Sequence, residues 1–179
     1  FIEGARKQGV SEEVATDVYS RMAKFAEYGF NKAHSTVYAH VGYQSGYLKA
    51  HYPVQFMTAN LSSVMDNPDK ILVMKNEAER MGIKILPPDV NKSQLECSIE
   101  DDHIRLGLMA IRNVGKAAEA VIAGRAKKKE PFASIFDMAR SVDLHQVNKK
   151  CFESLVYAGA LDSLHGTRAQ LFAAIDSAM

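Results

Sequence analysis

The chain has 179 residues, of which 47% are hydrophobic and 24% charged, with a formal net charge of +1. This size allows one ordinary domain or two small ones, and the composition excludes a wholly disordered chain. No stretch approaches the length of a membrane span, and no signal peptide is visible. Cys97 and Cys151 lie far apart without metal-ligand spacing, which predicts inert thiols in a reducing, cytoplasmic setting. Because the first residue is Phe1 and not Met, we expect a piece of a longer protein.

Helical periodicity dominates the first third of the chain. Ser11, followed by two glutamates, predicts the start of a helix over 11–27, and Tyr28–Phe30 is expected to break it. A second helix is expected over 31–50. Apolar and aromatic groups lie on nearly every face of it, which predicts burial on several sides; they are Val37, Tyr38, Val41, Tyr43, Tyr47 and Leu48. A shorter helix is expected over 54–65.

The middle of the chain contains the strand signals. A helix over 69–81 is expected to stop at Gly82, before an extended run at 83–88. Apolar and polar residues alternate over 95–100 and 104–106, on either side of two aspartates, which predicts a β-hairpin. Helical patterns then return over the segments 108–112, 116–125, 135–140, 148–157 and 168–178. The predicted fold class is therefore mainly α, with one small β-hairpin.

The first candidate site lies at the start of the second helix. Asn31 is a good N-cap, which places Lys32 and His34 in the first turn, beside unpaired backbone N–H groups. This arrangement would suit a bound anion such as a phosphate. The alternative is that Lys32 is solvated and His34 packs against Tyr38, one turn later.

The second candidate site is a short turn between two helical patterns, followed by a basic run. Six of the residues between Arg112 and Lys129 are basic and one, Glu119, is acidic. A turn that contains Gly115 can present successive N–H groups to a nucleic-acid phosphate, and nearby lysines would add affinity through counterion release. The alternative is an ordinary turn with a solvated basic tail. A similar turn recurs at Gly159, without lysines.

Signatures of a complete active site are missing from the sequence. We find no pair of strand-flanked aspartates for two Mg²⁺ ions, no phosphate-binding GxxxxGK[ST] loop and no nucleophile motif. The sequence therefore predicts no catalytic and no metal-binding residue in this chain.

Several blocks resemble, in order, the fingers region and the following module of bacterial replicative DNA polymerase III alpha subunits (DnaE type). They are FAEYGFNKAH (25–34), YLKAHYP (47–53), LPPDVNKS (86–93), IRLGL (104–108), NVG (113–115), VNK (147–149) and AGALD (158–162). The resemblance implies that residues 1–67 are the C-terminal part of a polymerase fingers domain. Residues 68–179 would be a tandem helix-hairpin-helix DNA-binding module, with the small β-hairpin at about 83–107.

The resemblance also implies roles for particular residues. Asn31, Lys32 and His34 would lie near the triphosphate of the incoming nucleotide, with Ala33 where the family has a serine. The module would bind duplex DNA without reading sequence, and Asn113 occupies the place of the first hairpin glycine. The expected DNA-binding residues are Arg112, Asn113, Val114, Gly115, Lys116, Arg125, Lys127 and Lys128.

The implied parent is a DNA-directed DNA polymerase, a nucleotidyltransferase that uses Mg²⁺. Its catalytic aspartates would lie in a palm domain outside this chain, so we expect the fragment to be inactive and to bind no cofactor itself. Expected partners are primer-template DNA, dNTP in the parent, the other polymerase domains, and replisome subunits such as the sliding clamp through segments outside this fragment, with no membrane. The rival hypotheses are a stand-alone helical DNA-binding protein and a protein-interaction module.

Overall fold

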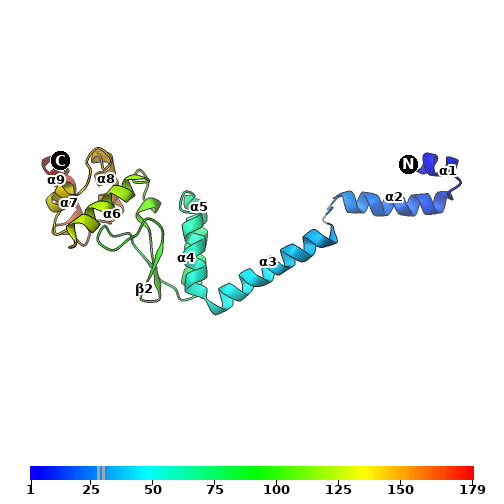
Figure 1. Cartoon of the computed structure of the whole chain (residues 1–179), viewed down its shortest axis with the longest axis horizontal. Helices are drawn as coiled ribbons and strands as arrows, with labels where there is room; N and C mark the ends of the chain where they lie inside the picture. Colours follow the sequence, from blue (N-terminus) through cyan, green and yellow to red (C-terminus); the bar gives the residue numbers. More distant parts are fainter. Residues whose placement is uncertain (28, 30) are drawn as a thin grey trace. The chain divides into compact units, whose positions relative to one another are not determined.

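The computed structural model describes residues 1–27, 29 and 31–179 and divides them into two compact units, Phe1–Tyr47 and Leu48–Met179 (Figure 1). The first unit contains α1 (Ile2–Lys7), α2 (Glu12–Glu27) and most of α3 (Lys32–His51), and the unit boundary falls within α3. The helix break predicted at Tyr28–Phe30 involves Tyr28 and Phe30, which lie outside the described residues.

Local signals set the start of α2, as predicted. The Ser11 side chain accepts a hydrogen bond from the Val14 N–H at 3.4 Å, and two glutamates occupy the first turn, where the helix dipole favours negative charge. One of them, Glu12, forms an ion pair with Arg6 that joins α1 to α2.

The expectation that the second helix is buried on several sides is wrong for this structure. No described residue of α3 is buried, and Tyr38 and Tyr43 are 64% and 71% exposed. An apolar pattern on all faces indicates that a helix is suited to being covered. The covering surface need not belong to these 179 residues.

The second unit begins with two helices that pack against each other, α4 (Pro53–Ser63) and α5 (Pro68–Arg80). A proline opens each helix, where its missing N–H costs nothing, and the Asn67 side chain caps α5 by accepting from the Lys70 N–H at 3.1 Å. The domain boundary after Asn67, expected from the resemblance, concerns a longer protein and stays a prediction.

Three strands of the second unit form a small sheet in the order β1 (Ile85–Leu86), β3 (His103–Arg105), β2 (Ser98–Glu100). Strands β2 and β3 form the predicted antiparallel hairpin. Its turn residues Asp101 and Asp102 have φ values of 49° and 59°, which a two-residue hairpin turn of type I′ requires. The extended run at 83–88 contributes β1, whose parallel pairing with β3 was not predicted. The sheet and the helices α4 and α5 enclose a small core of Met57, Leu61, Ala78, Ile83 and Ile104.

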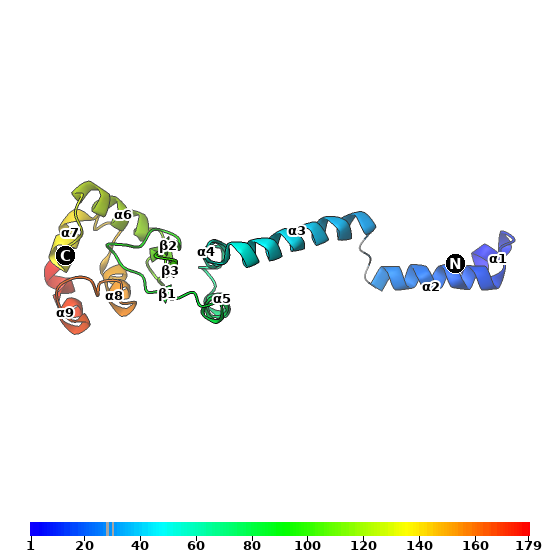
Figure 2. The ribbon, with the colours of Figure 1, turned by 90° about the horizontal axis from the view of Figure 1, so that it is seen from below.

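The predicted return to helix is confirmed beyond the sheet. The elements are the 3₁₀ turn η1 (Leu108–Ala110) and the helices α6 (Ala117–Lys128), α7 (Ile135–Ser141), α8 (Lys149–Tyr157) and α9 (Arg168–Ala178). Figures 1 and 2 show α6, α7, α8 and α9 gathered on the side of the sheet away from α4 and α5. The expected helix over 108–112 is limited to η1, because the backbone at Ile111 is extended. The fold is mainly helical, as predicted.

A larger core holds these helices together, with Phe132, Phe152 and Leu155 almost fully buried. The loop between β1 and β2 is tied to this core by hydrogen bonds. The Asn91 side chain accepts from the Phe132 N–H at 2.7 Å and donates to the Phe132 carbonyl at 3.0 Å. Asn91 therefore joins the loop after β1 to the helices. The turns between the helices are held by this packed core.

Candidate nucleic-acid interface

The first hairpin, residues 112–116 between η1 and α6, contains two residues in the left-handed region. Asn113 and Gly115 both have positive φ values, 67° and 42°. Glycine adopts this left-handed region without steric cost, and asparagine tolerates it better than most residues. Asn113 can therefore stand where the family has a glycine without changing the course of the turn.

One side of the first hairpin packs in the core, and the other side is exposed to solvent. Val114 is 2% exposed and its N–H donates to the Ile111 carbonyl at 3.1 Å, so the centre of the turn is held in the core. The next two N–H groups, those of Gly115 and Lys116, donate no hydrogen bond to any described residue. They immediately precede α6, and the dipole at the start of a helix favours an anion beside such unpaired donors. The first hairpin therefore offers backbone donors to a ligand.

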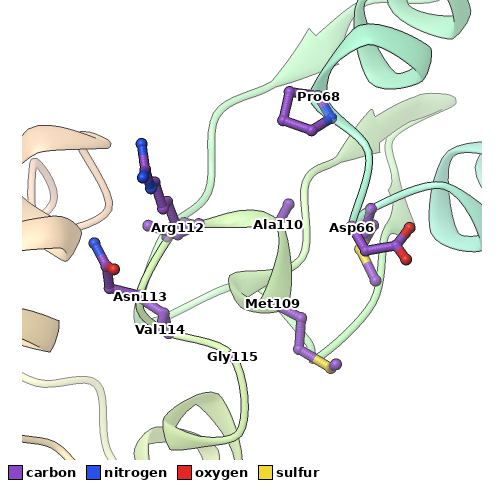
Figure 3. A pocket seen from close by; sticks show the side chains of 10 residues that line it. Asp66, Pro68, Met109, Ala110, Arg112, Asn113, Val114 and Gly115 are labelled. Atoms are coloured by element: carbon purple, nitrogen blue, oxygen red, sulfur yellow. The ribbon is translucent and has the colours of Figure 1, made fainter.

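Two cationic side chains flank these donors. Arg112 and Lys116 are exposed, and within the described part of the chain neither forms an ion pair. An open hollow of about 610 Å³ lies beside the turn, and its opposite wall includes Asp66 and Pro68. Figure 3 shows the Arg112 and Asn113 side chains leaving the turn on the side away from Asp66. Positive charge therefore accompanies the open N–H groups without being neutralised locally.

Two of the predicted DNA-binding cations already have partners inside the fold. The Arg125 guanidinium donates through Nη1 to the carbonyls of Val90 and Ser93, at 3.0 and 2.9 Å, and burial lowers the pKa of this group. The Lys128 Nζ lies 3.1 Å from the carboxylate of Asp137. Arg125 thus fastens the β1–β2 loop to α6, and Lys128 fastens the end of α6 to α7.

Lys127 is exposed but lies near the C-terminal end of α6. Eleven residues separate it from Lys116, which corresponds to roughly 16 Å along a helix axis. The structure therefore brings Arg112, Asn113, Val114, Gly115 and Lys116 together, and it places Lys127 and Lys128 at the far end of the helix. The DNA-binding role of each residue stays a prediction.

One neighbour of the first hairpin was not predicted from the sequence. The Asn113 side chain donates a hydrogen bond to the hydroxyl of Ser154, on α8, at 3.2 Å. Ser154 and Tyr157 share the wall of a second hollow with Arg112 and Asn113. A contact between residues 41 positions apart leaves no periodic signal, so pattern analysis could not have found it.

The second hairpin, residues 158–162 after α8, differs from the first in its donors. Its N–H groups close the end of α8: that of Gly159 donates to the Val156 carbonyl at 3.0 Å, and that of Ala160 to the Leu155 carbonyl at 2.9 Å. Gly159 has a φ of 74°, so this is the glycine-terminated helix end in which the turn amides satisfy helical carbonyls. These two donors are not available to a phosphate.

An internal ion pair covers the second hairpin. Arg168 donates to both carboxylate oxygens of Asp162, at 2.8 and 2.5 Å. This bidentate contact lowers the pKa of Asp162 and raises that of Arg168. A Cβ at position 159 would lie 2.3 Å from Nη2 of Arg168, so the guanidinium rests directly on the glycine. The charge at this turn is neutralised within the chain.

The first candidate site, at the start of α3, has the predicted cap. The Asn31 side chain accepts from the His34 N–H at 2.7 Å, and Lys32 is exposed in the first turn. The ring centroids of His34 and Tyr38 are 4.3 Å apart, which is the packing contact that the alternative interpretation predicts. The role of Asn31, Lys32 and His34 at a triphosphate stays a prediction.

The described residues show no metal site, no disulfide and no membrane span. No three His, Cys, Asp or Glu side chains gather there in a way that could hold a metal ion. Neither cysteine forms a disulfide, and burial raises the pKa of the Cys151 thiol to about 11, which makes it a poor nucleophile. No helix in residues 1–27, 29 and 31–179 has the length and apolar character to cross a bilayer.

Comparisons with known proteins identify relatives along the whole chain. The family model for the helix-hairpin-helix motif matches residues 82–171, which contain both hairpins. The chain is 44% identical over 179 residues to the DNA polymerase III subunit alpha of Bacillus subtilis (strain 168), covering 100% of this chain and 16% of that protein. It is 42% identical over 176 residues to the same subunit of Thermus aquaticus, covering 98% of this chain and 14% of the relative. For Escherichia coli (strain K12) the identity is 41% over 181 residues, covering 100% and 16%. The chain spans about a sixth of the length of these curated relatives.

Proposed function

The chain belongs to the helix-hairpin-helix family across residues 82–171, and we propose that it binds duplex DNA there through the first hairpin. The ligand is the sugar–phosphate backbone, because backbone N–H groups and cations recognise phosphates without reading base sequence. Binding of this kind suits a protein that must hold DNA at every position along a template.

One observation carries the proposal: the N–H groups of Gly115 and Lys116 have no acceptor among the described residues and lie between two exposed cations, Arg112 and Lys116. An ordinary solvated turn would need no flanking cations. The shared wall of Arg112, Asn113 and Tyr157 at the neighbouring hollow adds surface for the adjacent part of the backbone.

We further propose that the chain works as a segment of a replicative DNA polymerase alpha subunit in the cytoplasm. Its relatives carry that name, and the match runs through both units. In the parent, template-directed DNA synthesis would use Mg²⁺ held by residues outside this chain, and contacts with the sliding clamp and other replisome subunits would use further segments. The 179 residues alone should not extend a primer. Incorporation of nucleotides by the purified chain would refute this.

The start of α3 has a separate role in this proposal. Asn31, Lys32 and His34 would position the triphosphate of an incoming nucleotide as part of the fingers, with Lys32 and the capped helix start facing the phosphates. The support is the resemblance and the Asn31 cap. Protection of Lys32 from amine-modifying reagents by dNTP, in the full-length polymerase, would test it. Equal modification with and without dNTP would count against it.

Salt-dependent binding tests the DNA proposal directly. The affinity of the 179-residue chain for a random duplex should fall steeply from 50 to 200 mM salt. Lys116→Ala should lower the affinity about tenfold at 0.1 M salt and reduce the salt slope by about 1, because one phosphate contact is lost.

A matched control is Lys149→Ala in the same module. The Nζ of Lys149 is held by Asp176 at 2.5 Å, so its charge is already paired and its loss should leave duplex affinity nearly unchanged. Absence of duplex binding at low salt would overturn the proposal. Salt-dependent binding to an acidic protein, with none to duplex DNA, would support the rival protein-interaction module instead.

A further inference from the structure

We propose that Asn113 and Ser154 form a positioning link that holds the first hairpin in its DNA-binding conformation. This inference rests on the proposed function and deepens it, because it assigns a role to the hydrogen bond that joins the first hairpin to α8. Neither side chain needs to touch DNA for the link to act.

Asparagine at position 113 is not the residue that backbone conformation alone would favour. A φ of 67° is reached by glycine without steric cost, whereas an L-residue carries some strain there. Unlike glycine, asparagine brings a side chain that can form a hydrogen bond. What it supplies is an amide that donates to the Ser154 hydroxyl at 3.2 Å.

Ser154 is a firm anchor for this bond. Its neighbours on α8, Cys151 and Leu155, are 1% and 0% exposed, so the helix is fixed in the main core. The Ser154 carbonyl also accepts the Ala158 N–H at 3.0 Å, at the regular end of the helix. A bond to Ser154 therefore ties the turn to a rigid element.

Besides this link, the outer half of the first hairpin is held by backbone hydrogen bonds from the first turn of α6 to the carbonyls of Val114, Gly115 and Lys116. Val114 anchors the centre of the turn in the core, but no described residue beyond its chain neighbours lies within 4 Å of the Cβ position at Gly115. Glycine has more accessible backbone conformations than other residues, and the one described donor to the Gly115 carbonyl is the Ala118 N–H, at 3.1 Å. Fixing Asn113 restrains the residues on one side of Val114, and the start of α6 restrains those on the other, so the N–H groups of Gly115 and Lys116 stay aimed in one direction.

The link should affect binding more than stability. The bond is exposed to solvent, where a neutral hydrogen bond contributes little to folding. Duplex binding, however, must order the turn if it is not already ordered, and that entropy cost lowers affinity. A positioning role therefore predicts weaker binding with an unchanged number of phosphate contacts.

The test measures duplex affinity, its salt slope and urea unfolding for the 179-residue chain and four variants. Asn113→Gly keeps the backbone conformation and removes the donor, and Ser154→Ala removes the acceptor. We expect each to weaken duplex binding about three- to fivefold, with the salt slope and the unfolding midpoint close to those of the parent chain. The double variant should bind no more weakly than either single variant. Ser154→Thr, which keeps the hydroxyl, should bind duplex DNA with the affinity of the parent chain.

Three results would overturn the link while leaving the proposed function standing: full affinity in Ser154→Ala, additive losses in the double variant, or a much larger loss in Asn113→Gly than in Ser154→Ala, which would indicate that the Asn113 amide contacts DNA itself. If the parent chain itself shows no salt-dependent duplex binding, the proposed function fails first. The parent measurement therefore separates the two failures.

Discussion

The two hairpins of this chain share a shape and differ in what their donors do. At the first, the N–H groups of Gly115 and Lys116 have no acceptor among the described residues, and the adjacent cations are unpaired there. At the second, the N–H groups of Gly159 and Ala160 close a helix end, and Arg168 is neutralised by Asp162.

The difference teaches that a helix–turn–helix outline does not make a phosphate site. A donor that satisfies a carbonyl of its own helix has nothing left for a ligand, and a guanidinium held by two carboxylate oxygens attracts anions weakly. By this criterion we assign the proposed DNA binding to the first hairpin and not to the second, and the Asn113 side chain joins the first hairpin to Ser154 of α8.

The largest expected effect comes from reversing the charge at the first hairpin. Arg112→Glu combined with Lys116→Glu should weaken duplex binding about a hundredfold at 0.1 M salt, because two phosphate contacts are replaced by repulsion. The comparison variant at the second hairpin is Asp162→Asn with Arg168→Gln, which removes the ion pair there without changing the net charge and should bind normally. Fluorescence anisotropy with a labelled duplex measures both. Equal losses of duplex affinity in the two variants would contradict the assignment of DNA binding to the first hairpin alone.

The next effect concerns the stability of the second hairpin. Gly159→Ala should lower the free energy of unfolding by about 1–2 kcal/mol, because alanine is strained at positive φ and its Cβ displaces the Arg168 side chain. Urea unfolding measures the loss. The folded variant should keep its duplex affinity, so a parallel fall in DNA binding would indicate that the second hairpin also contacts DNA.

A smaller loss of duplex affinity is expected at the C-terminal end of α6 than at its start. Lys127→Ala should weaken duplex binding only about two- to threefold, because this exposed lysine lies roughly 16 Å along the helix from Lys116. Lys128→Ala should change affinity even less and cost about 0.5–1 kcal/mol of stability, since it loses its ion pair with Asp137. If Lys128→Ala weakens binding as much as Lys116→Ala, the basic run contacts DNA along its length.

The smallest effect is a pH dependence at the second hairpin. Arg168 lowers the pKa of Asp162 in the folded chain, so the stability contributed by this pair is complete above the ordinary aspartate pKa of about 4. It is lost as the pH falls through the lowered folded-state value. Asp162→Asn should therefore flatten the acid side of the stability profile, measured by urea unfolding between about pH 5 and pH 2. An unchanged profile would mean that the pair does not stabilise the turn.

Local signals in the sequence predicted much of this fold. Pro68 after Asn67, and Thr167 before α9, start helices where they were expected, because caps act within a few residues. The aspartate turn between β2 and β3 was found for the same reason. The short parallel pairing of β1 with β3 was missed, because two residues carry no alternation to read.

The candidate site was predictable only in its backbone. Asn113 and Gly115 mark a turn in any sequence, but a basic residue looks the same whether it is solvated or paired. The sequence therefore could not tell that Arg125 binds two carbonyls while Lys116 has no ion-pair partner among the described residues. The exposed aromatic residues of α3 are a similar case. Their pattern predicts that the helix surface is covered, but it does not identify the covering surface.

The most direct test observes the backbone donors themselves. In an NMR titration of the ¹⁵N-labelled chain with a short duplex at low salt, we expect the amide signals of Gly115 and Lys116 to shift strongly and to return as salt is added. Those of Gly159 and Ala160 should stay in place. Shifts at Gly159 and Ala160 with none at Gly115 and Lys116 would contradict the assignment of the first hairpin as the DNA-binding turn.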